Sequence, residues 1–351
     1  MKFDLSDDQQ LLRSATADFL ASECPIDVVR QVAESKGEGF SRAHWSKLAE
    51  LGYLGLVVGE RHGGQGLGPV ELAVVCHELG KACFPGPYLD VVLAAKALEE
   101  SGAASDVLES VLAGKSIAVL ARRDTVWPGD KSNLRFSGDR VTGSSFFVPH
   151  GASADRLVVV AGDDVVLADG PFDVTPMPTL DEAQRFAEVK LDNPARRLGA
   201  RGLVDALDDL AAVAAAAYAL GLGEAALQRS VTYSRQRETF GKPIGSYQVL
   251  QHRMADMLLR SESSRAAVYR AAWSLAEGSA DAGLVVAAAK AYAVESACAI
   301  TRDSVQIHGG NGFTWEYDLH CFLKRAITLD QHYGTTIAMT DRALVAFEAT
   351  L

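Results

Sequence analysis

Apolar residues recur at helical spacing from the start of the chain, which predicts a helical first segment over residues 1–116. The first run follows Ser6 and Gln9, whose spacing predicts a capping box at a helix start. A second run lies around Trp45, and a third, over 71–81, follows a cluster of glycines. The apolar positions of the first run are Leu11, Leu12, Ala15, Phe19 and Leu20.

Between residues 117 and 198 the pattern changes to short runs of β-branched and apolar residues separated by glycine, aspartate and proline. Five of the eleven prolines lie between Pro149 and Pro194. Short strands at such regular spacing predict an antiparallel sheet or a small barrel. The runs are 117–120, 146–148, 157–160 and 165–167.

Long alanine-rich helical patterns return in the third segment, 199–351, with glycines near the breaks between them. Helices of this length and composition pack closely, as in a four-helix bundle. The apolar run from Leu210 to Gly223 is too short and too rich in alanine to span a membrane, so we expect a buried helix there. The predicted helices are 203–236, 244–277, 281–308 and 318–350. The fold class is α+β: a helical domain (1–116), a small antiparallel β domain (117–198) and a helical bundle (199–351).

The amino-acid composition argues against several classes of protein. Of the 351 residues 48% are hydrophobic and 23% are charged, which excludes a disordered chain. A formal net charge of −11 disfavours a nucleic-acid-binding protein, whose phosphate contacts need clustered basic residues. The start of the chain lacks the basic and apolar pattern of a signal peptide. The cysteines form no CxxC pair, so we expect reduced core thiols in a cytoplasmic protein; they are Cys24, Cys76, Cys83, Cys298 and Cys321.

The segment 235–242, Arg-Gln-Arg-Glu-Thr-Phe-Gly-Lys, lies between two predicted long helices. Its guanidinium groups stand beside an aromatic ring and a glycine, and such groups hold phosphate in a bidentate manner. The same residues are also typical of a basic last helical turn that Gly241 closes. Both interpretations stay open on these residues alone.

A second candidate segment is 306–313, Gln-Ile-His-Gly-Gly-Asn-Gly-Phe. Its glycines allow positive φ and a close approach to an anion, but they are also typical of a helix C-cap. The spacing is not that of a dinucleotide fingerprint. His308 suits either a structural hydrogen bond or catalysis. A third segment, 330–336, places a glycine before two threonines and predicts a helix start that faces a ligand.

Together these motifs carry a resemblance. The α–β–α order, with RxTFGK at 237–242, QxxGGNGF at 306–313 and YGTT at 333–336, resembles the acyl-CoA dehydrogenase family of flavoproteins. The first segment resembles that family's first helical domain at LAELGYLGL (48–56), ERHGGQGL and HELGK. The resemblance covers nearly the whole chain.

The resemblance implies FAD bound between subunits and an acyl-CoA substrate, which loses its α-proton to a glutamate and its β-hydrogen as hydride to the flavin. It also implies that the arginine motif and the glycine loop reach across an interface to a neighbour's FAD, and that an electron-transfer flavoprotein is the acceptor. The implied cofactor-binding residues are Arg237, Thr239, Phe240, Gln248, Gln306, Gly309 and Gly310.

The chain departs from the family where the catalytic base is expected. Tyr333, preceded by His332, stands where the glutamate of the tail belongs. The alternative position on the preceding long helix holds Ala211, followed by Ala212 in place of an arginine. A phenol is ionised to about one part in a thousand at pH 7, a penalty near 4 kcal/mol, so Tyr333 is a poor substitute. Hence no catalytic residue is assigned to this chain.

The β segment departs as well. The stretches 121–130 and 144–149 differ from the family's flavin-wrapping strands. The chain thus keeps the half-site that it would lend to a neighbour and lacks much of its own. This asymmetry predicts a heteromeric α2β2 enzyme in which a second, similar subunit supplies the glutamate, as in acyl-CoA dehydrogenases of steroid side-chain breakdown.

Two other hypotheses remain open. One is a self-sufficient homo-oligomeric flavoenzyme, a dehydrogenase or an oxidase, with a displaced base among His332, Tyr333 and Glu262. The other is a binding or scaffold protein that kept the fold and lost the chemistry.

Overall fold

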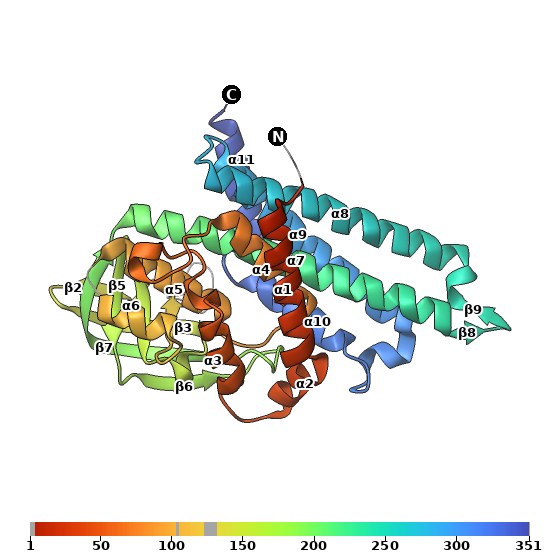
Figure 1. Ribbon diagram of the computed structural model, residues 1–351, viewed down its shortest axis with the longest axis horizontal. Coiled ribbons are helices and arrows are strands. Elements are labelled where there is room, and N and C mark those ends of the chain that lie inside the picture. Colours follow the sequence, from red (N-terminus) through yellow and green to blue (C-terminus); the bar gives the residue numbers. More distant parts are fainter. Residues whose placement is uncertain (1–3, 103–104, 123–131, 351) are drawn as a thin grey trace. The chain divides into compact units, whose positions relative to one another are not determined.

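The computed structural model describes residues 4–102, 105–122 and 132–350 (Figure 1). These residues form two compact units, each assembled from segments distant in sequence. The first unit comprises the described residues of Met1–Arg30, Pro69–Phe84 and Ala211–Leu351, and the second those of Gln31–Gly68 and Pro85–Leu210. The predicted first domain, 1–116, therefore contributes to both units.

The first unit is helical. Its first helix begins with the predicted capping box, since Gln9 N–H donates to Ser6 Oγ and the Gln9 side chain accepts from the Ser6 backbone. Helix α9 packs against α8, α10 and α11, and α4 packs against α1 and α8. The helices are α1 (Asp7–Glu23), α4 (Pro69–Lys81), α7 (Arg201–Gln236, of which the residues from Ala211 onward belong to this unit), α8 (Gln248–Ala276), α9 (Ala282–His308), α10 (Leu319–Gln331) and α11 (Thr336–Glu348).

Two glycines let helices α4 and α7 touch through their backbones. A Cβ atom added to Gly80 would lie 2.0 Å from the carbonyl oxygen of Tyr218. One added to Gly221 would lie 2.1 Å from the carbonyl oxygen of His77. No side chain fits at either distance, so this close crossing explains the glycine of the 77–81 motif.

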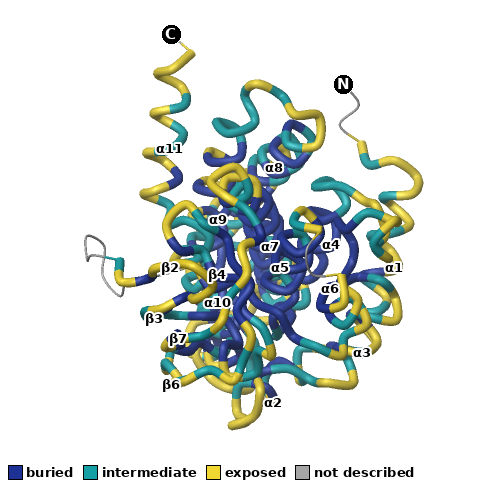
Figure 2. Tube along the Cα trace, turned by 90° about the vertical axis from the view of Figure 1, so that its left-hand side faces the viewer, coloured by how far each residue is buried: buried dark blue, intermediate teal, exposed yellow. Residues whose placement is uncertain are grey.

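The apolar run of α7 is buried, as predicted. Every residue from Leu210 to Gly223 is buried, and Figure 2 shows this helix in dark blue whereas α11 is largely exposed. The stretches Arg201–Gln236 and Ala282–Phe313 are long and apolar enough to cross a membrane, but 89% and 61% of their apolar windows are buried within the protein. Such burial is typical of core helices.

The predicted last helix, 318–350, is wrong as a single element. It breaks into α10 and α11 at a turn where Tyr333 and Gly334 have φ of 58° and 94°. Thr335 then N-caps α11 by accepting a hydrogen bond from Ala338 N–H at 3.1 Å. The helix start predicted within 330–336 is therefore confirmed.

The second unit contains a sheet with strand order β1-β4-β5-β7-β3-β2, and β6 also pairs with β7. Among the strands that the structure describes in this sheet, the predicted antiparallel pairing holds for every pair except β1 with β4, which is parallel. All four residues of β1 are buried, as expected of a parallel strand. The strands are β1 (Ala118–Ala121), β2 (Arg135–Ser137), β3 (Arg140–Pro149), β4 (Arg156–Ala161), β5 (Asp164–Asp169), β6 (Asp173–Met177) and β7 (Phe186–Gly199).

Short helices complete this unit, and α5 packs against β1 and β7. They are α3 (Arg42–Glu50), α5 (Tyr88–Ser101) and α6 (Ser105–Leu112), with 3-10 turns at Tyr53–Gly55, Glu60–His62 and Gly151–Ser153. Helix α2 (Ile26–Glu34) carries the chain from the first unit into the second.

All five cysteines are buried free thiols, as predicted. Burial raises the pKa of Cys24 to about 12, although Arg325 opposes the shift. Burial also raises the pKa of Cys298 to about 11. These thiols belong to the core.

Candidate functional site

The arginine motif forms a hairpin beyond the end of α7. Strands β8 (Glu238–Thr239) and β9 (Lys242–Pro243) pair antiparallel. Phe240 and Gly241 connect them with φ of 52° and 79°, the combination found in type I′ turns. The interpretation of Gly241 as the residue that closes the helix is therefore wrong, because α7 ends at Gln236 and Gly241 forms the hairpin turn.

Phe240 is the tip of this hairpin and is unusual in two ways. Its side chain is 98% exposed, although an aromatic ring gains most from burial. Its left-handed backbone costs a non-glycine residue about 1–2 kcal/mol. A strained, exposed aromatic residue favours a contact with something outside this chain.

Arg237, Thr239 and Gln248 lie around the base of the hairpin. Arg237 is exposed, and among the described residues its guanidinium has no ion-pair or hydrogen-bond partner. Thr239 is half-buried and its carbonyl oxygen accepts a hydrogen bond from Tyr247 at 3.2 Å. Gln248 is exposed at the first position of α8. A free guanidinium beside a ring and a helix N-terminus is a suitable receptor for phosphate.

The glycine motif continues α9 as a 3-10 turn, Gly309–Phe313. Gly309 caps α9 with φ 59° and ψ −134°, a conformation essentially restricted to glycine, and its N–H donates to Gln306 O. The helix-cap interpretation is thus confirmed for Gly309. Gln306 itself is exposed in the last turn of α9.

Unlike Gly309, Gly310 does not adopt a backbone conformation that requires glycine. Its φ is outside the left-handed region, and a Cβ atom there would meet nothing within 4 Å in the part of the chain that the structure describes. The surface at Gly310 is therefore open to a group that approaches the backbone from outside. Such an open glycine would allow a ligand to approach the backbone closely.

The fold brings these two motifs together although about 70 positions separate them. The ring of Tyr233, one turn before the hairpin, stacks on His308 with centroids 4.1 Å apart. A shared apolar cluster, which includes Ile244, Val305 and Ile307, packs beneath them. Figure 1 shows the hairpin and the loop after α9 at the same end of the C-terminal helices. In the sequence, Arg237, Thr239 and Phe240 follow Tyr233, and Gln306, Gly309 and Gly310 lie next to His308, whereas Gln248 begins α8 after the hairpin.

His308 fits the structural interpretation. Its Nδ1 lies 2.8 Å from the carbonyl oxygen of Ser304, so this nitrogen carries the proton. Burial lowers the pKa of His308, and the hydrogen bond to Ser304 offsets only part of that shift. The imidazole is therefore held neutral and oriented by its own helix.

The turn that carries Tyr333 is held by a residue that sequence reasoning missed. The fully buried Lys290 donates from Nζ to the carbonyl oxygens of Leu329, at 2.9 Å, and Gly334, at 3.0 Å. Burial lowers the pKa of Lys290 to about 8. The sequence feature that could have identified Lys290 is its position as one lysine within an otherwise apolar run of α9. Asp330 uses its carboxylate to accept from Thr336 N–H at 3.2 Å, so it caps α11.

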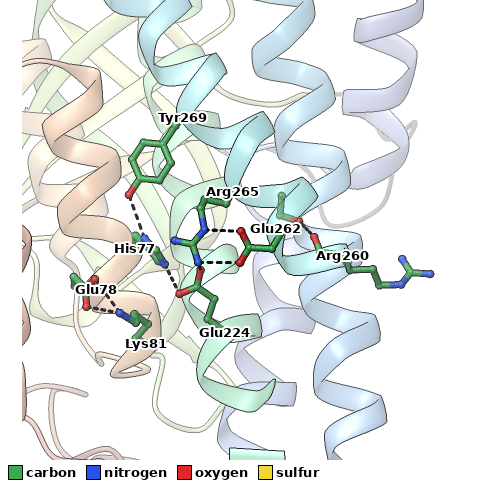
Figure 3. A network of polar contacts seen from close by, with 9 residues as sticks. His77, Glu78, Lys81, Glu224, Arg260, Glu262, Arg265 and Tyr269 are labelled. Carbon is green, nitrogen blue, oxygen red and sulfur yellow. Dashed lines mark hydrogen bonds and ion pairs between the residues drawn. The ribbon is translucent and has the colours of Figure 1, made fainter. Parts of the chain in front are cut away.

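The two base positions of the family and the candidate Glu262 lie on three different elements of the structure. Ala211 is buried in α7, and the rings of His332 and Tyr333 lie 5.9 Å apart. Glu262 forms an ion pair with Arg265 at 3.3 Å and is 55% exposed, at the edge of a polar network (Figure 3). These surroundings give Glu262 a charge partner rather than a substrate.

That network was also missed from the sequence, because its members come from α4, α7 and α8. The buried His77 places Nε2 at 2.9 Å from Glu224 and Nδ1 at 3.2 Å from the hydroxyl of Tyr269 (Figure 3). Arg265 also binds Glu224. Burial raises the pKa of Glu224, but His77 and Arg265 outweigh it, so the net shift is downward. Apart from its exposed edge, the network is buried or half-buried and connects the three helices to one another.

The β stretches that depart from the family are only partly described. Residues 123–130 of the first stretch lie outside the described residues. Arg122, just before them, forms an ion pair with Asp208. The second stretch lies in β3, where a bulge falls between Ser145 and Val148 and Phe147 has a φ of 52°.

Two family models match the chain. The acyl-CoA dehydrogenase C-terminal domain matches residues 203–342, and the acyl-CoA dehydrogenase N-terminal domain matches residues 6–113. Together they cover most of the chain, including the hairpin and the glycine loop.

Proteins and solved structures that are similar to this chain agree with the two family models. The chain is 34% identical over 323 residues to acyl-CoA dehydrogenase IpdE2 of Mycolicibacterium smegmatis, covering 92% of this chain and 93% of that one. It is 30% identical to IpdE2 of Mycobacterium tuberculosis, covering 91% of each. A structure of the ChsE4-ChsE5 complex from Mycobacterium tuberculosis matches with a TM-score of 0.90 and 27% identity over 99% of each chain. A Tcur3481-Tcur3483 steroid acyl-CoA dehydrogenase variant matches at 0.89 and 25% over 98% of each chain.

Proposed function

The chain belongs to the acyl-CoA dehydrogenase family, and we propose that it is the subunit of a heteromeric, FAD-dependent member that lends cofactor contacts while its partner supplies the base. The observation that carries this proposal is the contrast between two sites. One end of the first unit presents a free Arg237, an exposed Phe240 and an open Gly310. The two base positions of the family hold Tyr333 and Ala211.

FAD, when bound, supplies the acceptor for the hydride that leaves the β-carbon of the acyl thioester. The residues of this chain bind and orient it. Arg237 donates to a phosphate oxygen, and the Gly309–Gly310 backbone allows the cofactor a close approach. Phe240 covers an apolar part of the cofactor or of the partner, which offsets its backbone strain. Thr239, Gln248 and Gln306 provide further polar contacts.

The proton of the α-carbon goes to a glutamate of the second subunit. Ala211 carries no group that can accept this proton, and a phenol of ordinary pKa, about 10, is almost fully protonated at pH 7. The enzyme is therefore active only as a hetero-oligomer, an α2β2 heterotetramer in our proposal. Each functional site then combines one half from each kind of chain, which a homo-oligomer could not achieve.

We also propose the substrate, the electron acceptor and the cellular location. The substrate is an acyl-CoA with a bulky side chain of steroid origin, supported by the likeness to a solved steroid acyl-CoA dehydrogenase and to the ChsE4-ChsE5 complex. An electron-transfer flavoprotein accepts the electrons, as the family resemblance implies. The five buried, free thiols support a cytoplasmic location.

Co-expression tests the proposal. The chain purified alone should be flavin-poor and inactive on acyl-CoA. Together with a second family member that has the glutamate, it should form a yellow complex with about one FAD per pair of different chains. Stoichiometric FAD and turnover in the lone chain would establish the self-sufficient enzyme instead. Binding of neither FAD nor acyl-CoA, alone or with such a partner, would indicate the scaffold protein.

A further inference from the structure

Tyr233 and His308 connect the two segments that carry the predicted cofactor contacts. Their rings stack with centroids 4.1 Å apart and planes inclined by 23°. The carbonyl oxygen of Tyr233 accepts the N–H of Arg237 at 2.8 Å, and His308 immediately precedes Gly309. Each ring is thus within one turn of the backbone that would contact FAD.

Further contacts fix the orientation of both rings. Tyr317 lies edge-on to both, at 5.9 Å from each centroid. Asn311 donates from Nδ2 to the hydroxyl of Tyr233 at 3.2 Å, so the glycine loop reaches back to α7. His308 is held from its own helix through the bond to Ser304. The stack is therefore part of a defined cluster and not a chance surface contact.

Both segments are short. Strands β8 and β9 have two residues each, and a hairpin of that size is marginal in water. The 309–313 turn contains three glycines, which lose much conformational freedom when ordered. At their bases, the Tyr233–His308 stack joins the end of α7, which precedes the hairpin, to the end of α9, which precedes the loop.

Resting on the proposed function, we infer that Tyr233 and His308 are positioning residues, which hold the Arg237 hairpin and the Gly309–Gly310 loop at one fixed separation so that both contact a single FAD. Ordering the two segments before binding reduces the entropy lost when the cofactor arrives. Neither ring needs to touch FAD for this role.

Hydrogen exchange of the chain alone tests the coupling without any cofactor. Tyr233→Leu removes the stack, and we expect faster exchange in both 237–247 and 309–318. Tyr233→Phe keeps the stack and should retain most protection. Tyr292→Leu, at a 38% exposed tyrosine elsewhere on α9, is the matched control and should change neither segment. Faster exchange confined to the segment next to the substitution in both Tyr233→Leu and His308→Leu would overturn the inference.

FAD affinity of the co-expressed complex then tests the consequence. Tyr233→Leu and His308→Leu should each raise the Kd for FAD by about tenfold or more, and Tyr233→Phe by much less. Arg237→Ala separates the two claims. If Arg237→Ala loses FAD and Tyr233→Leu does not, the positioning role is wrong and the proposed function stands. If Arg237→Ala binds FAD normally, the proposed function is wrong.

Discussion

The ammonium group of Lys290 lies 2.9 Å from the carbonyl oxygen of Leu329 and holds the last turn of α10 from inside the first unit. Because burial lowers the pKa of Lys290 from an ordinary 10.5 to about 8, the unfolded chain binds more protons than the folded chain between these values. Its contribution to the free energy of unfolding should therefore increase with pH over this range, by at most about 3 kcal/mol.

Urea unfolding at pH 7.5 and pH 10 measures this effect. Lys290→Met should reduce the increase of stability with pH relative to the unaltered chain. Lys115→Met, at an exposed lysine, is the control and should leave the pH dependence unchanged. An equal pH dependence in Lys290→Met and in the unaltered chain would contradict the prediction.

Phe240 should show opposite effects on stability and on cofactor binding. Asparagine tolerates the left-handed backbone better, so Phe240→Asn should raise the free energy of unfolding of the lone chain by up to about 1 kcal/mol. The same change removes the exposed ring, and we expect a several-fold weaker retention of FAD in the heteromeric complex. Thermal unfolding and the flavin absorbance of the dialysed complex measure the two effects. If FAD retention is unchanged, Phe240 has no role at the interface.

The close crossing of α4 and α7 predicts a strong effect of one methyl group. Gly80→Ala should lower the free energy of unfolding by about 1–3 kcal/mol or more, because its Cβ atom would lie 2.0 Å from the carbonyl oxygen of Tyr218. Gly202→Ala is the matched control: its Cβ atom would meet nothing within 4 Å, and alanine favours the helix by up to about 1 kcal/mol. Chemical unfolding of both variants gives the comparison, and a mild effect of Gly80→Ala would mean that the helices can separate.

The contribution of Glu224 to the free energy of unfolding should depend on pH. Since its pKa is lowered in the folded chain, its contribution is complete above the ordinary value of 4.5 and is lost as the pH falls through the folded pKa. Glu224→Gln should therefore cost about 1–3 kcal/mol at pH 7, and the difference from the unaltered chain should shrink in acid. Unfolding at pH 7 and pH 4 measures it. Glu277→Gln, at an exposed glutamate, should show no such difference.

Substitutions in the turn between α10 and α11 distinguish the heteromeric enzyme from a self-sufficient one. In the heteromeric complex, Tyr333→Phe and His332→Ala should leave the turnover of acyl-CoA within about twofold, because neither residue is the base. A loss of about 10²–10⁴ in either variant would identify it as a general base. Single-turnover flavin reduction measures the step directly.

The sequence predicted those features that depend on local spacing. The capping box at Ser6, the start of α11 and the long buried helix α7 follow from residues close together in the chain. The two candidate cofactor segments were recognisable for the same reason, because each family motif is a local run of residues. The sequence predicted a helix start within 330–336 and also a single helix over 318–350. The second prediction was wrong because the chain turns at Tyr333, which adopts a backbone that tyrosine rarely has.

Features that depend on distant pairing were not predictable in this way. The parallel pairing of β1 with β4 depends on a connection that no local pattern specifies. The His77–Glu224 contact joins residues 147 positions apart. Likewise, the sequence marked Arg237 and Gly309 as separate candidates, whereas the Tyr233–His308 contact that unites them is a property of the packed helices.

The burial of all five cysteines has a practical consequence for following assembly. A maleimide fluorophore should react slowly with the folded protein, because each thiol is buried and the pKa values of Cys24 and Cys298 are raised. One cysteine introduced at the exposed hairpin tip would therefore carry the dye alone. In the heteromer that we propose, its emission should change when the second subunit contacts that tip.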